Sequence, residues 1–245
     1  MSDKIIISKK EHPYGVITIE TPIKNGIKDG VEKWYYENGE IYKTIPYKNS
    51  KKEGIERWYY INGIIYKEIP YINDKKEGIA KKYDFFSGQI EVETSYVNGQ
   101  KEGIEKKYHL NGKIMVEIPY LNNRRQGIST EYNYDGEIKS VVQYKNNQKD
   151  EVFEEYYQSG ELKVKGAYIN NKKEGILTQY YKSGELKVEV PHKNNKIDGI
   201  AKEYYTNGEL KSKTSLKNNL KNGIATIYSE EGCIVEIPYI NDKAD

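Results

Sequence analysis

The sequence predicts an all-β fold, an elongated array of about nine β-hairpin repeats of 24 residues that form one twisted antiparallel sheet. Three observations predict it: a regular spacing of glycines, a tyrosine at one place in every repeat, and Ile or Leu two residues after the second glycine. Glycines recur every 9 to 15 residues, which excludes helices because each glycine costs about 1 kcal/mol inside a helix. Tyr, Ile and Val favour strands.

Two glycine series define the repeat. The first recurs every 24 residues, with one spacing of 25 and with Glu151 in the sixth place: Gly30, Gly54, Gly78, Gly103, Gly127, Gly175, Gly199 and Gly223. The second follows about nine residues later: Gly39, Gly63, Gly88, Gly112, Gly136, Gly160, Gly184, Gly208 and Gly232. A tyrosine stands five residues after each place of the first series: Tyr35, Tyr59, Tyr83, Tyr108, Tyr132, Tyr156, Tyr180, Tyr204 and Tyr228. Two short runs per repeat, each bounded by turn residues, predict a β-hairpin.

The turn at the second glycine is predicted from the register that separates apolar from polar side chains. A three-residue loop such as Glu37-Asn38-Gly39 pairs Tyr35 with Ile41, and Val31 with Ile45, on one inner face. The same register makes favourable pairs on the other face: Trp34 with Tyr42, Trp58 with Tyr66, Glu131 with Lys139, Glu155 with Lys163 and Glu203 with Lys211. We therefore predict a type I turn with a glycine bulge. Two like-charge pairs count against this register, Glu56 with Glu68 and Glu105 with Glu117.

The link between successive repeats is predicted to be a longer, charged turn. It contains Lys51, Lys52, Lys75, Lys76, Arg124, Arg125, Lys172 and Lys173. These cations could meet an anionic membrane surface or RNA, but acidic residues such as Glu53 and Glu77 stand beside them, which favours a solvated edge. Residues 1–26 are expected to form an N-terminal cap with a partial repeat, residues 27–239 the repeat array, and residues 240–245 a C-terminal tail.

The composition limits both the core and the partners. The 245 residues include 25 Tyr and only 3 Phe, so most large apolar side chains carry a hydroxyl that needs a partner when buried, and we expect a shallow core. The 39 Lys+Arg and 37 Asp+Glu give a net charge of +2, which makes nucleic acid an unfavoured partner. No apolar run approaches the ~20 residues of a membrane span.

We expect a cytoplasmic protein as the sequence stands. Ile5, Ile6 and Ile7 are too few for the apolar stretch of a signal peptide. The alternative is a secreted or surface-exposed protein whose signal peptide has been removed.

One repeat is specific enough to indicate a family. The segment Lys-Lys-Glu-Gly54-Ile-Glu-Arg-Trp-Tyr59-Tyr60-Ile-Asn62-Gly63-Ile-Ile resembles the MORN-repeat variant found in many bacterial proteins, and the resemblance extends from about residue 23 to Tyr239. It implies a non-enzymatic repeat scaffold for protein–protein interaction. Proteins with this variant are often labelled antitoxins of toxin–antitoxin systems, and related MORN arrays are regarded as protein-interaction or membrane-surface modules.

No set of residues predicts catalysis, a cofactor or a metal. His12, His109 and His192 are 97 and 83 residues apart, without a second ligand at metal-binding spacing. Cys233, the single cysteine, excludes an internal disulfide and has no histidine near it in the array to activate it. We expect no catalytic residue, no cofactor and no metal site.

The first two full repeats carry the one feature that breaks the repeat symmetry. Trp34 and Trp58 are the only tryptophans. With four tyrosines they form what we term the aromatic patch: Trp34, Tyr36, Tyr42, Trp58, Tyr60 and Tyr66. Exposed aromatic residues are typical of interaction surfaces, so this patch is the expected binding site for a protein partner, either a toxin or a host or envelope component. A purely structural role, stacking across strands or lying beneath the N-terminal cap, is the alternative.

Overall fold

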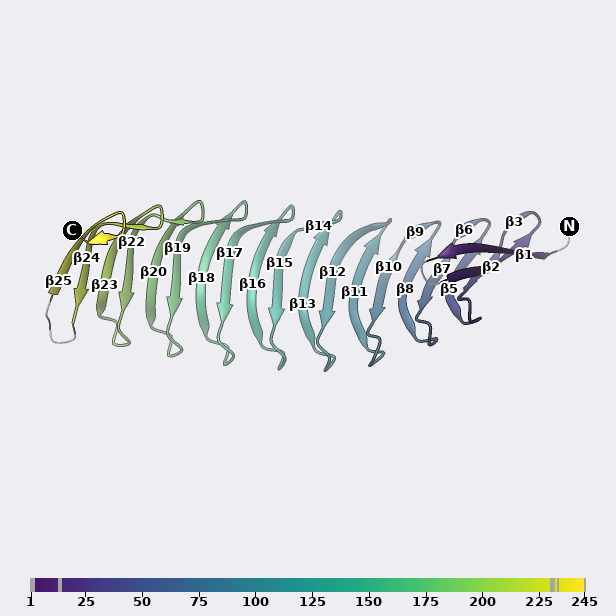
Figure 1. Ribbon diagram of the computed structural model, residues 1–245, viewed down its shortest axis with the longest axis horizontal. Helices are drawn as coiled ribbons and strands as arrows, with labels where there is room; N and C mark the ends of the chain where they lie inside the picture. The colour runs from purple at the N-terminus through teal and green to yellow at the C-terminus, as the bar shows by residue number, and fades with distance from the viewer. Residues whose placement is uncertain (1–2, 13–14, 230–231, 233, 245) are drawn as a thin grey trace. The chain divides into compact units, whose positions relative to one another are not determined.

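The computed structural model describes residues 3–12, 15–229, 232 and 234–244. These residues form β-strands joined by turns, in two compact units that divide the chain at Arg124 and Arg125. Within each unit, strands pair antiparallel and follow one another in chain order (Figure 1), and a two-residue strand and the longer strand after it share the preceding strand as partner. The predicted all-β array of hairpin repeats is confirmed.

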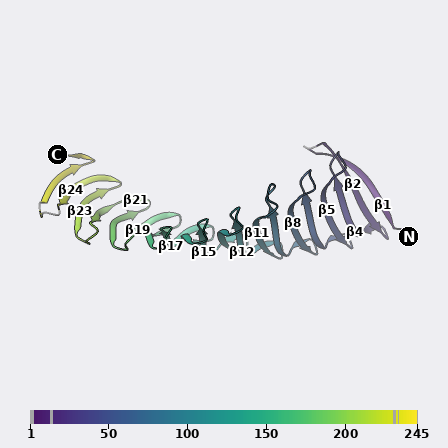
Figure 2. The ribbon, with the colours of Figure 1, turned by 90° about the horizontal axis from the view of Figure 1, so that it is seen from below.

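The first unit, Met1–Arg124, begins with a hairpin and continues with the first repeats. Its strands are β1 (Lys4–His12), β2 (Gly15–Lys24), β3 (Ile27–Lys28), β4 (Gly30–Tyr35), β5 (Ile41–Lys48), β6 (Lys51–Lys52), β7 (Gly54–Tyr59), β8 (Ile65–Ile72), β9 (Lys75–Lys76), β10 (Gly78–Tyr83), β11 (Ile90–Val97), β12 (Gln100–Tyr108) and β13 (Ile114–Leu121). The hairpin of β1 and β2 adjoins β4, as Figure 2 shows at the purple end of the chain.

The unit boundary falls within β14 (Arg124–Arg125), and the second unit, Arg125–Asp245, repeats the same hairpins. Its strands are β15 (Gly127–Tyr132), β16 (Ile138–Lys145), β17 (Gln148–Tyr156), β18 (Leu162–Ile169), β19 (Lys172–Tyr180), β20 (Leu186–Lys193), β21 (Lys196–Ile197), β22 (Gly199–Tyr204), β23 (Leu210–Lys217), β24 (Leu220–Tyr228), β25 (Ile234–Ile240) and β26 (Lys243–Ala244). The described part of the chain holds no helix capable of spanning a bilayer.

The glycine turn has the predicted three-residue loop. The Tyr36 N–H donates to the Glu40 carbonyl at 2.8 Å, and the Gly39 N–H donates to the Tyr36 carbonyl at 3.0 Å. Gly39 has a φ of 86°, the left-handed conformation that completes this type of turn. Tyr35 lies opposite Ile41, as predicted.

A bulge just beyond this pair shifts the rest of the register by one residue. Trp34 lies opposite Lys43, and Val31 lies opposite Pro46, so the predicted pairs of Trp34 with Tyr42 and Val31 with Ile45 are wrong. The same shift occurs in the next repeat, where Trp58 lies opposite Lys67 in place of Tyr66. The bulge leaves one extra residue on the second strand and exchanges its two faces.

The exchange moves the buried residues to the face that was expected to be outer. Ile45 and Glu32 are paired and buried, 3% and 2% exposed, and we name their side of the sheet the glutamate face. Val31 and its counterparts in later repeats are exposed on the opposite face. The predicted inner position is therefore wrong for Val31, whereas Ile45 is buried as expected but shares its face with Glu32 instead of Val31. Tyr35 and Ile41 are half-buried.

The shift also removes the two like-charge pairs. Glu56 lies opposite Ile69, and Arg57 lies opposite Glu68 with their side chains 2.8 Å apart. Two predicted acid–base pairs survive as side-chain contacts because their residues still lie on adjacent strands beside the bulge. Lys139 contacts Glu131 at 2.7 Å and Lys211 contacts Glu203 at 2.8 Å.

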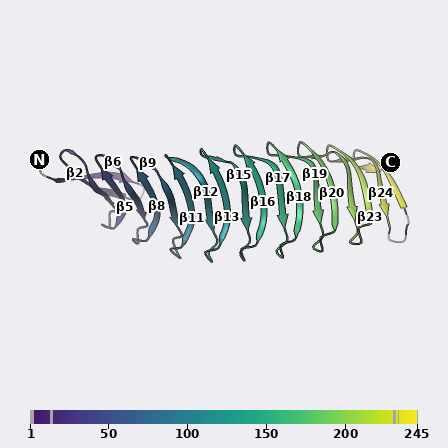
Figure 3. The same ribbon diagram turned by 180° about the vertical axis from the view of Figure 1, so that it is seen from behind.

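The link between repeats is a two-residue turn, so the prediction of a longer turn is wrong. Asn73 and Asp74 have φ values of 48° and 67°, and positive φ at both residues defines the type I′ hairpin turn. Asn and Asp tolerate this conformation. The lysines that suggested a long loop belong to the flanking strands. In Figure 3 these turns line one edge of each unit, and the glycine turns line the other.

Each type I′ turn is attached to the corresponding turn of the preceding repeat. The Asn171 N–H donates to the Lys149 carbonyl at 2.8 Å, and the Lys149 N–H donates to Asn171 Oδ1 at 2.7 Å. The same two bonds join Asn195 to Lys173. We name this series the turn ladder.

Candidate functional site

Buried glutamates organise the first repeats on the glutamate face. Glu56 is 3% exposed, and its carboxylate lies 2.5 Å from Lys52 Nζ and accepts a hydrogen bond of 2.6 Å from Trp58 Nε1. Glu32 has the same partners, Lys28 at 2.6 Å and Trp34 Nε1 at 2.8 Å. A carboxylate removed from water needs such charge-assisted hydrogen bonds.

The pKa of Glu32 reflects two opposing effects, burial and hydrogen bonding. Burial raises the pKa of this carboxyl, but the hydrogen bonds from Lys28, Trp34 and Thr21 together bring it below its ordinary value. Glu32 is therefore held ionised.

A lysine lies between the two tryptophans. The ammonium of Lys43 is 3.8 Å from the ring centroid of Trp34 and 4.4 Å from that of Trp58. Lys43 is only 8% exposed, and burial lowers the pKa of its ammonium while the carboxylate of Glu56 partly opposes the effect. Cation–π attraction on both sides compensates for the lost hydration.

An aromatic groove lies beside this arrangement, towards the glycine turns. It has a volume of about 510 Å³. We define the aromatic groove by its lining residues, which are Tyr36, Tyr42, Trp58, Tyr59, Tyr60, Ile61 and Tyr66. The Tyr36 hydroxyl donates to the Tyr59 carbonyl at 2.9 Å and so fixes one wall.

Edge-to-face and tilted ring contacts hold the groove in shape. The ring centroids of Tyr36 and Tyr42 are 5.0 Å apart, and those of Tyr42 and Trp58 are 5.3 Å apart. On the other side, the Tyr60 and Tyr66 centroids are 5.0 Å apart. Such pairs prefer this spacing, so the groove is formed before any ligand arrives.

The structure brings five of the six predicted site residues into this groove. Trp34 does not line it, and Tyr36 is buried, 7% exposed, while the others are half-buried. Both tryptophans donate to buried glutamates and hold Lys43, so they have structural contacts as well. The aromatic patch is thus part structural network and part open groove.

Sequence reasoning missed two phenylalanines that extend the groove. The Phe85 ring lies 4.8 Å from the Tyr60 ring, edge-on, and Phe86 lies 5.1 Å from Phe85. Phe86 is 91% exposed. The signal was present in the sequence: the one spacing of 25 residues inserts a residue in this turn, and the turn holds two of the three phenylalanines.

The second unit fills the corresponding positions differently. In three of its repeats, a lysine replaces the tyrosine equivalent to Tyr42 or Tyr66 and lies over the neighbouring tyrosine ring. The ammonium-to-centroid distances are 5.9 Å for Lys163 over Tyr157 and 5.3 Å for Lys187 over Tyr181. In the repeats of the first unit that bear the groove, aromatic rings stand where these ammonium groups lie.

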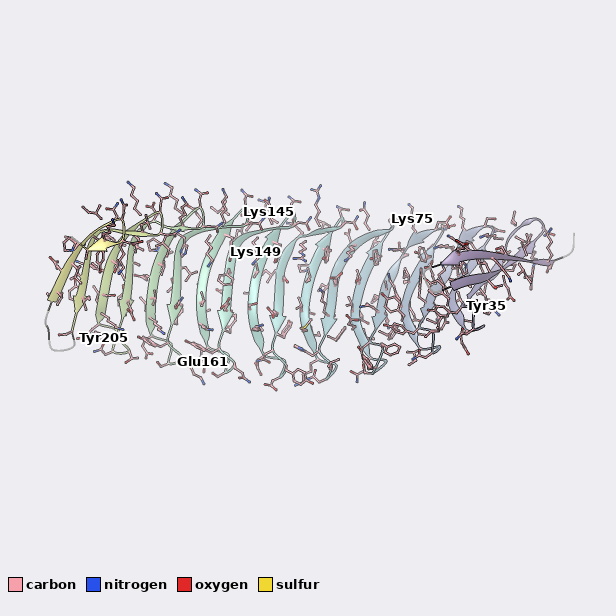
Figure 4. The ribbon with its side chains drawn as sticks, in the orientation of Figure 1. Tyr35, Lys75, Lys145, Lys149, Glu161 and Tyr205 are labelled. Carbon is pink, nitrogen blue, oxygen red and sulfur yellow. The ribbon has the colours of Figure 1, made fainter. Side chains whose placement is uncertain are left out.

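The link lysines divide into two sets. In most links the second basic residue lies over a tyrosine of the next strand, at 4.6 Å for Lys52 over Tyr71 and 4.9 Å for Lys76 over Tyr96. Other lysines beside the turns are exposed at the edge, among them Lys75 and Lys145, which Figure 4 labels there. The neighbouring acid Glu53 accepts a hydrogen bond of 2.9 Å from the Asn73 N–H.

Within the described residues, no group of three or more His, Cys, Asp or Glu side chains could hold a metal ion. His192 Nδ1 lies 2.9 Å from the Val190 carbonyl oxygen in the place of a repeat tyrosine. Cys233 lies outside the described residues.

A hairpin array that carries an aromatic groove is typical of repeat proteins that bind other molecules. The MORN repeat variant model matches seven segments of the chain, residues 28–49, 52–73, 101–122, 125–146, 152–170, 173–194 and 197–218. The chain therefore belongs to the MORN repeat variant family, as the resemblance implied. MORN repeats are generally non-enzymatic modules for protein or membrane interaction.

No curated protein matches the chain. Among solved structures, one described as "Streptogramin B lyase structure" matches with a TM-score of 0.20 and 14% identity over 97% of this chain and 88% of that chain. A similarity at that score carries no argument about fold or function.

Proposed function

We propose that this chain is a non-enzymatic scaffold that binds a protein partner through the aromatic groove of its first two full repeats. One observation carries the proposal: the groove is open where the second unit places lysines over the equivalent tyrosines. A preformed groove with aromatic walls suits apolar side chains of a partner, because little ordering cost opposes binding.

Exposed residues at the rim support the same function. Ile61 is 58% exposed and lines the groove, and Phe86 is 91% exposed beside it. Apolar side chains of this kind at the edge of an aromatic pocket are typical of protein interfaces. The family resemblance adds a specific form of the proposal, an antitoxin or immunity-type protein whose partner is a toxin.

Site-specific photocrosslinking tests the groove and captures a partner of any identity. A photoreactive phenylalanine analogue replaces Ile61, and a matched variant carries it at Lys182, the exposed residue at the same place in a repeat of the second unit. We expect a discrete crosslinked protein from Ile61 only. Equal crosslinking from both positions would refute the groove as the binding site.

Affinity for the crosslinked partner then measures the contribution of the rim. Ile61→Asp should weaken binding by roughly 30-fold, the loss of a single hot-spot residue worth about 2 kcal/mol, whereas Lys182→Asp should not. A toxin partner would, in addition, lose its activity on binding the unmodified chain and keep it beside Ile61→Asp. Unchanged affinity of a folded Ile61→Asp variant would contradict the proposal.

A further inference from the structure

The third full repeat lacks a glutamate that its neighbours use. In the repeats that begin at Gly54 and Gly103, Lys52 lies 2.5 Å from Glu56, and Lys101 lies 2.5 Å from Glu105. In the repeat that begins at Gly78, Ala80 stands in the place of the glutamate and is 7% exposed. Lys76 keeps its position over the ring of Tyr96.

A hollow lies where the missing carboxylate would be. It has a volume of about 170 Å³, room for several water molecules. Its lining residues are Lys67, Ala80, Lys81, Lys82, Val92, Thr94 and Tyr96. Except for Lys81, which alternates to the opposite face and pairs with Glu93 at 3.8 Å, they lie on the glutamate face, where the register of β8, β10 and β11 brings them together.

Positive charge around the hollow exceeds negative charge. Among the described residues, Lys82 pairs with Glu91 at 2.7 Å, and Glu56 and Glu105 are taken by their own lysines. Thr94 Oγ1 donates to Glu105 at 3.2 Å, so that carboxylate borders the hollow but is already paired. No carboxylate of the described residues lies within ion-pair distance of Lys67 or Lys76.

The uncompensated charge also affects Lys67. Burial lowers the pKa of its ammonium, and the charge of Lys76 lowers it further, against a smaller opposing effect of Glu56. A half-buried ammonium among other ammonium groups gains more than a surface lysine from an incoming anion.

We propose that this hollow binds a carboxylate, the side chain of an aspartate or glutamate on a protein partner. The chain's own glutamates show how it is held: Lys76 corresponds to Lys52, and Lys82 corresponds in sequence to Trp58, the second donor to Glu56. The ligand carboxylate completes the series of lysine–carboxylate pairs and offsets the desolvation of Lys67 and Lys76.

The hollow lies near the aromatic groove and is tested separately from it. Lys67, which lines the hollow, lies opposite the groove residue Trp58 in the sheet, and Lys82 Nζ is 5.9 Å from the ring centroid of Tyr66. A partner segment with an apolar residue and a nearby acidic residue fits the two sites together. The carboxylate site itself does not rest on the proposed function, because a small carboxylate can probe it alone.

The test is a titration of the full chain with sodium acetate at constant ionic strength, with sodium chloride as the balancing salt. The methyl signals of Val92, which lines the hollow, report binding by NMR. We expect a saturable shift in the unmodified chain and an affinity at least about tenfold weaker in Lys76→Gln and Lys67→Gln, from the loss of a charge-assisted contact. Lys75→Gln, the same charge change at the exposed turn edge (Figure 4), should bind as the unmodified chain does.

Ala80→Glu provides a second, independent variant. The new side chain should pair with Lys76 as Glu56 pairs with Lys52, abolish the acetate response and raise the melting temperature by about 2–4 °C. A linear, chloride-like response, equal effects of Lys75→Gln and Lys76→Gln, or undiminished acetate binding by Ala80→Glu would overturn the proposal. Saturation by inorganic phosphate at tenfold lower concentration than acetate would also overturn it, in favour of a phosphate site. Crosslinking from Ile61 in the Ala80→Glu variant reports on the groove separately.

Discussion

The ammonium nitrogen of Lys43 lies 3.8 Å from the ring centroid of Trp34, with the indole of Trp58 on its other side at 4.4 Å. Each indole N–H is directed to a buried glutamate, Glu32 or Glu56. The two tryptophans are therefore joined through a lysine that belongs to the strand between them. Both tryptophans therefore take part in this network, and Trp58 in addition lines the aromatic groove.

Replacing Lys43 by methionine tests the cation–π network. Lys43→Met keeps most of the side-chain volume and removes both charge contacts, so the free energy of unfolding should fall by about 1–2 kcal/mol. Urea denaturation followed by tryptophan fluorescence measures it, because the only two tryptophans flank the site. Lys48→Met, an exposed lysine on the same strand, is the control and should change little. Equal stability of the two variants would contradict the network.

Removing a buried glutamate should cost more than removing an exposed one. Glu56→Ala leaves Trp58 Nε1 and the Lys52 ammonium without their acceptor, and we expect a loss of about 1–3 kcal/mol. Glu40→Ala, at an exposed position in a glycine turn, is the matched control. Denaturant unfolding of both variants measures the two free energies of unfolding. A Glu56→Ala variant as stable as the unmodified chain would show that the carboxylate is not needed for stability.

Tyrosines on the face opposite the glutamate face predict how the stability of the fold changes at alkaline pH. Burial and a hydrogen bond of 2.7 Å to Glu68 raise the pKa of Tyr83 to about 12, and Tyr108 with Glu93 behaves alike. Because the folded pKa exceeds the ordinary value of 10, their contribution to stability is complete below pH 10 and is lost between about pH 10 and 12.

Spectrophotometric titration of tyrosinate, with circular dichroism in parallel, tests this response. We expect a group of tyrosines that ionises late and together with loss of strand signal. Tyr83→Phe should remove one tyrosine from the late group and no early one. Ionisation of all tyrosines in a single step near pH 10, with the fold intact, would be incompatible with these hydrogen bonds.

Glu151 occupies a place that glycine takes in the other full repeats. Its φ is 65°, a left-handed conformation that costs a side chain about 1–2 kcal/mol. Glu151→Gly should therefore raise the free energy of unfolding by about 1 kcal/mol. The reverse change in the next repeat, Gly175→Ala at a φ of 79° with no atom close to the new Cβ, should lower it by a similar amount. Chemical denaturation of both variants measures these free energies of unfolding. A destabilising Glu151→Gly would contradict the prediction.

The repeat and its glycine turn could be predicted because both depend on local backbone chemistry. A glycine that supplies a left-handed residue and a tyrosine at constant spacing leave little freedom in the turn, and Tyr35 and Ile41 pair accordingly. The bulge beside them is not marked by any special residue. The sequence did hold an indirect sign of it: the unshifted register opposes Glu56 to Glu68, whereas the bulge places Arg57 there.

The candidate site was predictable as a group of aromatic residues but not as a groove. The aromatic patch follows from composition and spacing alone. Which rings line an open volume depends on the bulge, which places Lys43 opposite Trp34 where Tyr42 was expected, and on the inserted residue, which places Phe85 against Tyr60. The role of Ala80 could not be predicted, since a missing side chain has meaning only beside the pairs that Glu56 and Glu105 make.

The turn ladder has a consequence for how such a gene can change. Most turns are bound to their predecessor through the same two hydrogen bonds, as in Asn171 with Lys149 and Asn195 with Lys173, and the turn at Gly99 keeps the backbone bond to Lys76. Excising or duplicating 24 codons in register, as unequal recombination between similar DNA segments does, therefore joins a turn to a turn of the same design. Within a unit, the number of repeats can evolve without any new contact being invented, while the aromatic groove and Ala80 stay fixed to the repeats that encode them.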